Sequence, residues 1–321
     1  MMVPVIHPWN EPLFESLKAR AERFPHALLI HGARGTGKLA LAEHTARFLL
    51  CEDAARRPCG RCEGCRWFAA GSHPDFRRLE PEALAREPDP DPDDAAGAPA
   101  RRAKPSTEIK IEQVRELAGF LNLRSHRGRL RVALVHPAED MNPNAANALL
   151  KGLEEPPAGA MFILVANRPA ELLPTIRSRC VALAVPIPPG PAALGWLAGQ
   201  GARNPQRWLA YAGGAPLRAL EYAAKGEVLE RLLQRPMPVD DRDELEPLAD
   251  ALQKIALDRA LSSLGLAPKY QTGSTPIERN PVKAREWLTF ARGMAERRLL
   301  SRHPLNPKLF SAEMLANLPS R

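Results

Sequence analysis

Long apolar runs are missing from this sequence. One of the longest, residues 161–166, has six residues, whereas a membrane-spanning helix needs about 20. The first seventeen residues contain no basic segment, no apolar stretch of signal length and no cleavage site, the features that mark a secretory signal. We therefore expect a cytoplasmic chain with no membrane segment.

Cysteine is also scarce, and its placement is uneven. Four of the five cysteines fall in residues 51–65, with the spacing Cys51-x7-Cys59-x2-Cys62-x2-Cys65. In a reducing compartment such a cluster favours a metal over disulfides. Four thiolates suit a closed, structural Zn²⁺ site, and an iron–sulfur cluster is the alternative. Cys180 stands apart, and we expect a small buried residue there rather than a nucleophile.

The composition supports a folded, basic protein. With 321 residues, of which 45% are hydrophobic, the chain is long enough for about two domains. The net charge is +8 at pH 7, which permits contact with a nucleic acid or another polyanion without proving it. Residues 86–105 are rich in proline, aspartate and alanine, so we expect a mobile loop without chemistry of its own.

Short apolar strands alternate with amphipathic helices in the first part of the chain. Strands are predicted at 26–31, 130–135 and 162–166, and helices at 11–23, 38–50, from 109 and from 142. This alternation predicts an α/β domain with a parallel sheet covered by helices on both faces. After about residue 188 the pattern is helical to the end.

A glycine-rich turn follows the first predicted strand. Residues 32–38, Gly-Ala-Arg-Gly-Thr-Gly-Lys, fit the phosphate-binding P-loop, and its candidate nucleotide contacts are Gly32, Gly35, Gly37 and Lys38. The following position should carry a hydroxyl that binds magnesium, but it is Leu39. The strand at 130–135 ends in His136-Pro137 instead of acidic residues, and Glu139 and Asp140 come later. We therefore expect neither Mg²⁺ nor hydrolysis. The loop is either a weak nucleotide site or a retained turn, so ATP binding stays open.

Three further segments carry a family resemblance. Residues 144–157 (NAANALLKGLEEPP), 177–180 (RSRC) and 71–75 (GSHPD), with the P-loop and the inserted cysteines, resemble bacterial clamp-loader AAA+ subunits. The resemblance covers roughly residues 5–225. Leu39 and His136-Pro137 are similar to the delta-prime type rather than to the ATP-hydrolysing gamma/tau type.

The resemblance implies a three-domain organisation. An α/β AAA+ domain with the zinc module at 51–65 would occupy residues 1–187. A small helical lid would follow at 188–228, and an all-α collar at 229–321 would hold the subunits together. From the residues alone, that last segment is expected to be a solvated helical surface, with a DNA contact as the alternative.

The resemblance also implies a function. Clamp loaders of DNA polymerase III open the ring-shaped sliding clamp and place it on primer–template DNA during replication, with ATP bound between neighbouring subunits. The partners would be gamma/tau and delta subunits, the clamp and DNA, but no membrane. A delta-prime type would be a rigid, non-hydrolysing stator.

Within the Ser-Arg-Cys motif, Arg179 would be an arginine finger toward a neighbour's ATP. From the sequence alone a solvated surface arginine is the favoured interpretation, and the resemblance reverses that preference. Asn167 matches a sensor position or is a plain hydrogen bonder at the end of a strand, and Arg218 is not included among the site residues.

Two other functions remain open. One is an active AAA+ ATPase of the gamma/tau type, which Leu39 and His136-Pro137 disfavour. The other is a free-standing zinc protein that binds DNA by itself, with a strong dependence on salt.

Overall fold

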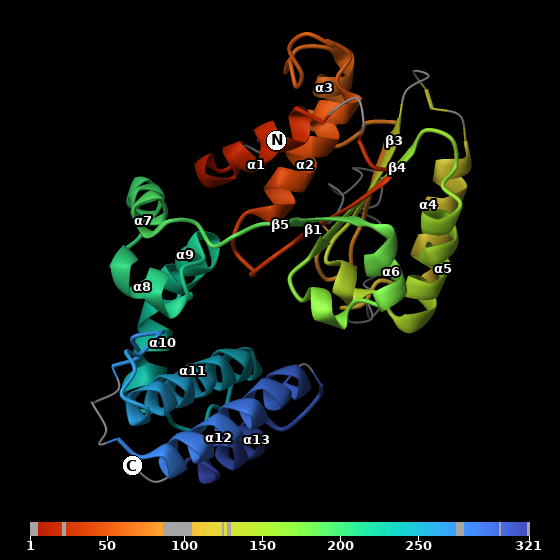
Figure 1. Cartoon of the computed structure of the whole chain (residues 1–321). Helices are drawn as coiled ribbons and strands as arrows, with labels where there is room; N and C mark the ends of the chain where they lie inside the picture. Colours follow the sequence, from red (N-terminus) through yellow and green to blue (C-terminus); the bar gives the residue numbers. More distant parts are fainter. Residues whose placement is uncertain are drawn as a thin grey trace, which may run out of the picture. The chain divides into compact units, whose positions relative to one another are not determined.

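The computed structural model describes residues 6–20, 24–85, 105–123, 125–126, 130–273, 279–301 and 303–319. It divides into two compact units, residues 1–187 and 188–321 (Figure 1), and each is considered by itself. Residues 86–104 of the expected loop and residues 21–23 of the first expected helix lie outside the described ranges. Every described helix is too short or too polar to span a bilayer.

Unit 1 is built on one parallel sheet with the strand order β2-β3-β4-β1-β5. Its register pairs Ala27 with Phe162 and Arg131 with Ala160. The predicted α/β fold with a parallel sheet is therefore confirmed. The strands are β1 (Ala27–His31), β2 (Phe76–Leu79), β3 (Arg131–Val135), β4 (Ala160–Ala166) and β5 (Val181–Ala184).

Helices cover both faces of the sheet because successive side chains of each buried strand point to opposite faces. In β1, Leu28 and Ile30 join the apolar cluster of α1 and α2, whereas Ala27 and Leu29 join that of α4, α5 and α6. Figure 1 shows these two groups on opposite sides of the strands. The helices are α1 (Glu11–Lys18), α2 (Lys38–Leu50), α3 (Glu63–Ala70), α4 (Ile111–Asn122), α5 (Pro143–Glu154) and α6 (Pro174–Arg179), with the 3-10 turns η1 (Pro8–Asn10), η4 (Ala138–Asp140) and η5 (Pro169–Glu171).

The two edge strands of the sheet, β2 and β5, were not predicted from the sequence. Three of the four residues in β5 are exposed, and β2 carries Arg77 and Arg78 on its exposed positions. Neither strand therefore has the buried apolar run that identified the three central strands. Charged and short edge strands also limit unwanted pairing with other chains.

All the secondary-structure elements in the described residues of unit 2 are helices. One apolar cluster surrounds Trp208 and Tyr211, and a second surrounds Trp287 and Met294. Helix α10 contributes Leu229 to the first cluster and Leu232 to the second, so the expected boundary at 228 stays a prediction. The helices are α7 (Gly190–Gly199), α8 (Pro205–Tyr211), α9 (Pro216–Ala224), α10 (Gly226–Gln234), α11 (Leu245–Ser263), α12 (Pro281–Leu300) and α13 (Pro307–Ala316), with the turn η6 (Arg242–Glu244).

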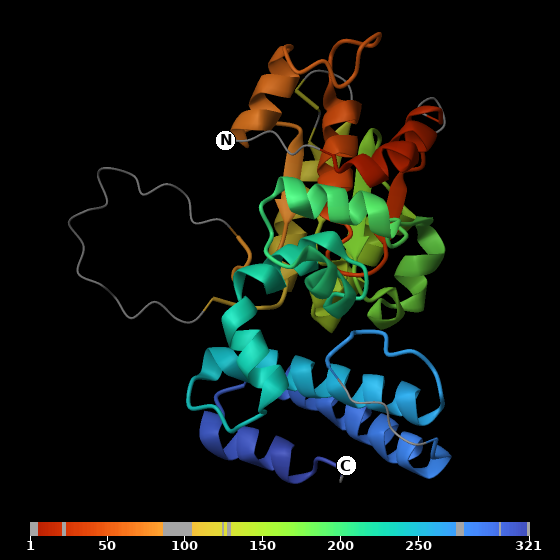
Figure 2. The ribbon, with the colours of Figure 1, turned by 90° about the vertical axis from the view of Figure 1, so that its left-hand side faces the viewer.

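A buried polar network joins helices from both clusters of unit 2. The Asp250 carboxylate of α11 lies 2.8 Å from Lys254 Nζ, accepts the Tyr222 hydroxyl of α9 at 2.9 Å and pairs with Arg298 of α12 at 3.0 Å. Burial would raise the pKa of Asp250, but Lys254 and Arg298 outweigh it and the pKa is lowered. The early part of α11 thus meets the late part of α12, and the two helices lie side by side in Figures 1 and 2.

Candidate functional site

The P-loop frame forms where it was predicted, between β1 and α2. Gly35 and Gly37 adopt φ angles of +87° and +83°, a region that disfavours side chains. Gly32 is required for a different reason, because a Cβ atom there would lie 2.3 Å from the Val185 carbonyl oxygen. The three glycines therefore serve the loop's backbone geometry whether or not a phosphate binds.

Lys38 is directed onto its own loop. Its ammonium donates to the Ala33 carbonyl at 2.7 Å, and the Thr36 hydroxyl donates to the same oxygen at 3.0 Å. The lysine is only 3% exposed, and burial lowers its pKa to about 8. The Lys38 ammonium, which in a P-loop protein normally contacts phosphate, is thus hydrogen-bonded to the loop itself.

The turn η1 packs against the same loop, a contact that was not predicted from the sequence. Trp9 Nε1 donates to the Thr36 carbonyl at 2.9 Å, and the Asn10 amide donates to Thr36 and Gly37 carbonyls at 3.0 and 3.3 Å. A Cβ atom on Gly37 would lie 2.5 Å from the His7 ring. No motif in residues 7–10 signals this contact, since it depends on the fold.

The two positions that would bind magnesium have other roles. Leu39 packs against the apolar cluster on the α2 face of the sheet. His136 follows β3, and burial together with Arg78 and Lys38 lowers its pKa to about 4, so its ring is neutral near pH 7.

Glu139 is the next acidic residue that could serve as a magnesium ligand, but its carboxylate is already engaged by other groups of unit 1. Its side chain is 1% exposed and lies 3.7 Å from Arg168, and its two oxygens accept the Asn167 backbone N–H at 3.0 and 3.2 Å. These contacts hold the carboxylate against the residues that follow β4. The Asn167 contact is made by its backbone N–H, so the role of its side chain stays a prediction.

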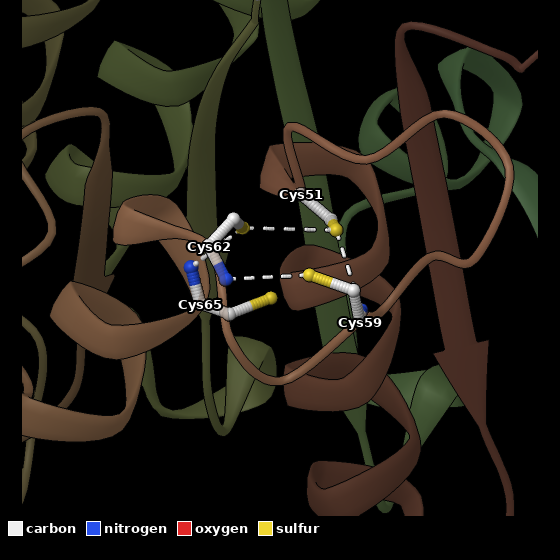
Figure 3. Close-up of side chains that lie close together, drawn as sticks. All are labelled: Cys51, Cys59, Cys62 and Cys65. Carbon is white, nitrogen blue, oxygen red and sulfur yellow. Dashed lines mark hydrogen bonds between the residues drawn. The ribbon is translucent and has the colours of Figure 1, made fainter.

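The four clustered cysteines come together in space (Figure 3). Their sulfur atoms all lie within 4.8 Å of one another, and Cys51 Sγ is 3.9 Å from Cys62 Sγ. Tetrahedral Zn²⁺ with bonds of about 2.3 Å separates its sulfurs by about 3.8 Å. The geometry fits a closed four-thiolate site that could hold a metal ion.

Backbone groups around the cluster favour thiolates. The N–H groups of Cys59, Cys62 and Cys65 point at cysteine sulfurs over 3.3–3.4 Å. Backbone N–H groups of Arg61 and Cys62 lower the pKa of Cys59 to about 6, whereas burial raises that of Cys51 to about 12. A bound cation would replace the protons on the buried sulfurs.

His73 and Asp75 form hydrogen bonds beside the cysteine module. The His73 ring accepts the Asp75 N–H at 3.0 Å, and the Asp75 carboxylate accepts the His126 N–H at 2.8 Å and lies 3.8 Å from Arg131 Nε. A Cβ atom on Gly64, between two of the cysteines, would lie 3.3 Å from His73. These buried groups connect the cysteine module to the edge of the sheet.

Arg179 lies in a different region from the P-loop. It ends α6 just before β5 begins, so it lies at the amino-terminal end of the parallel strands. The P-loop follows β1 and lies at their carboxyl-terminal end. Its side chain is 34% exposed and pairs with Glu154 at 2.6 Å. Arg218, in unit 2, instead donates to the Tyr222 hydroxyl at 2.9 Å. Burial raises the pKa of the Cys180 thiol to about 11, as expected for an unreactive residue.

Comparison with known proteins decides the family. The model of the family described as "DNA polymerase III, delta subunit" matches residues 10–188. The chain belongs to this family. Among curated relatives, DNA polymerase III subunit delta' of Pseudomonas aeruginosa is 42% identical over 226 residues, and that of Escherichia coli is 38% identical over 194. The expected delta-prime resemblance is therefore confirmed.

The similarity is partial in length. The aligned regions are 69% and 60% of this chain but only 62% and 52% of the P. aeruginosa and E. coli proteins. DNA polymerase III subunit tau of E. coli is 33% identical over 160 residues, 50% of this chain and 21% of tau. A gamma-subunit-related protein from Thermotoga maritima shares the fold, with a TM-score of 0.50 and 20% identity over 94% of this chain and 97% of that one.

Proposed function

We propose that the chain is a non-hydrolysing, delta-prime-type subunit of the replicative clamp loader. The family and the names of the delta' and tau relatives support this assignment. Its partners would be gamma/tau and delta subunits in the cytoplasm. Through that complex it would help place the sliding clamp on primer–template DNA.

One observation carries the non-hydrolysing part of the proposal. The P-loop frame is intact, yet Leu39 has no oxygen and packs against the apolar cluster, and His136 offers only ring nitrogens where magnesium prefers oxygen ligands. Without the metal, the charge that develops during phosphoryl transfer lacks its usual stabilisation. The rival gamma/tau-type ATPase would need Glu139 to leave its contacts with Asn167 and Arg168.

Arg179 would act on a neighbour's ATP. It lies at the amino-terminal end of the parallel strands, whereas this chain's own P-loop lies at the carboxyl-terminal end, and its side chain is partly exposed to solvent. A permanently charged, planar guanidinium can stabilise the γ-phosphate in the transition state. This placement favours an action in trans over an action on the same chain.

The four cysteines would hold structural Zn²⁺. All four positions of a tetrahedron would be filled by sulfur, which leaves no open site for chemistry. The metal would fix residues 51–65 and, through His73 and Asp75, their attachment to the sheet.

The test is ATP turnover in the complex reconstituted with gamma/tau and delta subunits. Arg179→Ala should remove turnover at the site it serves, because such fingers contribute roughly 10³-fold or more. Arg179→Lys should restore little, since lysine lacks the planar fork. Arg177→Ala, an exposed arginine on the same helix, is the matched control. Equal turnover for Arg179→Ala and Arg177→Ala would refute the finger.

A further inference from the structure

The guanidinium of Arg179 is folded back over its own helix. Its Nη1 donates to the Thr175 carbonyl, one turn earlier in α6, at 3.0 Å and to the Ser178 hydroxyl at 3.4 Å. Its Nη2 lies 2.6 Å from Glu154 Oε1. Both terminal nitrogens are thus engaged within unit 1, and an arginine that reaches another subunit must give these contacts up.

The partner of this guanidinium is exposed enough to be displaced. Glu154 is the last residue of α5, and its side chain is 48% exposed, against 34% for Arg179. Ion pairs of this exposure shift an equilibrium by roughly twofold to fivefold. A terminal phosphate carries more negative charge than a carboxylate and can accept two parallel N–H bonds from arginine. It therefore competes effectively for the same group.

We propose that Glu154 is a positioning residue that stows Arg179 against α6 and yields it to the γ-phosphate of a neighbouring subunit. The inference rests on the proposed function of Arg179. While the pair is closed, only a fraction of the chains offers a free guanidinium, so the affinity of that interface for ATP is reduced in proportion. Glu154 thereby sets the ATP concentration at which the neighbouring site becomes active.

The stowing contact can be tested on the full chain alone. Phenylglyoxal modifies accessible arginines, and mass spectrometry gives the rate at Arg179 by itself. Glu154→Gln should raise that rate twofold to fivefold. Glu155→Gln, an exposed glutamate one residue further on, makes the same charge change and should leave the rate unaltered. High salt should bring the wild-type rate toward that of Glu154→Gln, because it screens exposed charges.

The release can be tested in the reconstituted complex. Glu154→Gln should lower the KM for ATP twofold to fivefold with little change in kcat. In an Arg179→Ala background, where turnover is lost, Glu154→Gln should leave the Kd for ATP unchanged. A fall in kcat would mean that Glu154 holds the active pose, and an unchanged phenylglyoxal rate would mean that no stowing occurs. Either result overturns the inference. If the rate responds but Arg179→Ala leaves turnover intact, the proposed finger fails, and the release with it, while the stowing contact stands.

Discussion

At the scale of single residues, the P-loop keeps its backbone shape but lacks the side chain that would bind magnesium. Gly32 and Gly37 are required by close contacts with Val185 and His7 inside unit 1. Lys38 donates to the loop's own Ala33 carbonyl, and the partly buried Leu39 packs against the apolar cluster. A P-loop sequence can therefore persist for packing reasons after its metal ligands are gone.

The cysteine cluster gives a prediction about metal content. The purified chain should contain about one Zn²⁺ per molecule by elemental analysis, because four sulfurs within 4.8 Å form a closed site. Cys62→Ser should lose most of it, since it removes one ligand and the sulfur that accepts the Cys65 N–H. Cys180→Ser, the cysteine outside the cluster, should keep its zinc. Iron in place of zinc would contradict the assignment.

His136 predicts acid sensitivity. Its pKa in the folded chain is about 4, against an ordinary value of 6.5, so between these pH values the unfolded state binds the extra proton. The free energy of unfolding should therefore fall as the pH drops from 6.5 to 4, by up to about 3 kcal/mol. In urea unfolding, His136→Gln should flatten this dependence, whereas exposed His303→Gln should not. Equal slopes for the two variants would exclude His136 as the cause.

At the scale of elements, the sequence predicted what local periodicity encodes. The strands that begin at Ala27, Arg131 and Ala160 are buried apolar runs, and the helix from Pro143 has Asn142 as its N-cap, with a 2.8 Å bond from the Ala145 N–H. The clustering of the four cysteines was predictable because they are close in sequence. The edge strands β2 and β5 were not, since they lack such runs.

Contacts between distant segments were beyond the sequence. The hydrogen bond from Trp9 to the P-loop joins residues 27 positions apart in the sequence, and the Glu154–Arg179 pair joins two helices. Only the i,i+4 spacing of Asp250 and Lys254 hinted at the network in unit 2. Such contacts require the fold to be known first.

That network should stabilise unit 2 strongly. Lys254→Met leaves the Asp250 carboxylate, which is 6% exposed, without one of its two cationic partners. Breaking a buried ion pair from one side costs about 3 kcal/mol or more. Lys308→Met, which breaks the exposed Lys308–Asp240 pair, should change stability by less than about 1 kcal/mol. Urea unfolding followed in unit 2 would refute the network's role if the two variants were equally stable.

At the scale of the whole molecule, the two units carry different kinds of information. The family model and the P-loop, cysteine and arginine features fall in residues 10–188, almost entirely within unit 1. Unit 2 has helices, apolar clusters and a buried polar network, and its sequence contains no motif that indicates a ligand. The proposed collar role of residues 229–321 therefore depends on the family, and the proposed chemistry depends on unit 1.

The most direct test of the central claim is Mg²⁺-dependent ATP hydrolysis by the purified full chain, beside Lys38→Ala. The account predicts no turnover above background for either protein, because Leu39 and His136-Pro137 supply no magnesium ligand. Turnover by the wild-type chain that Lys38→Ala abolishes would contradict it. Glu139 or Asp140 would then have to be the metal ligand, and the chain would be a motor of the gamma/tau type.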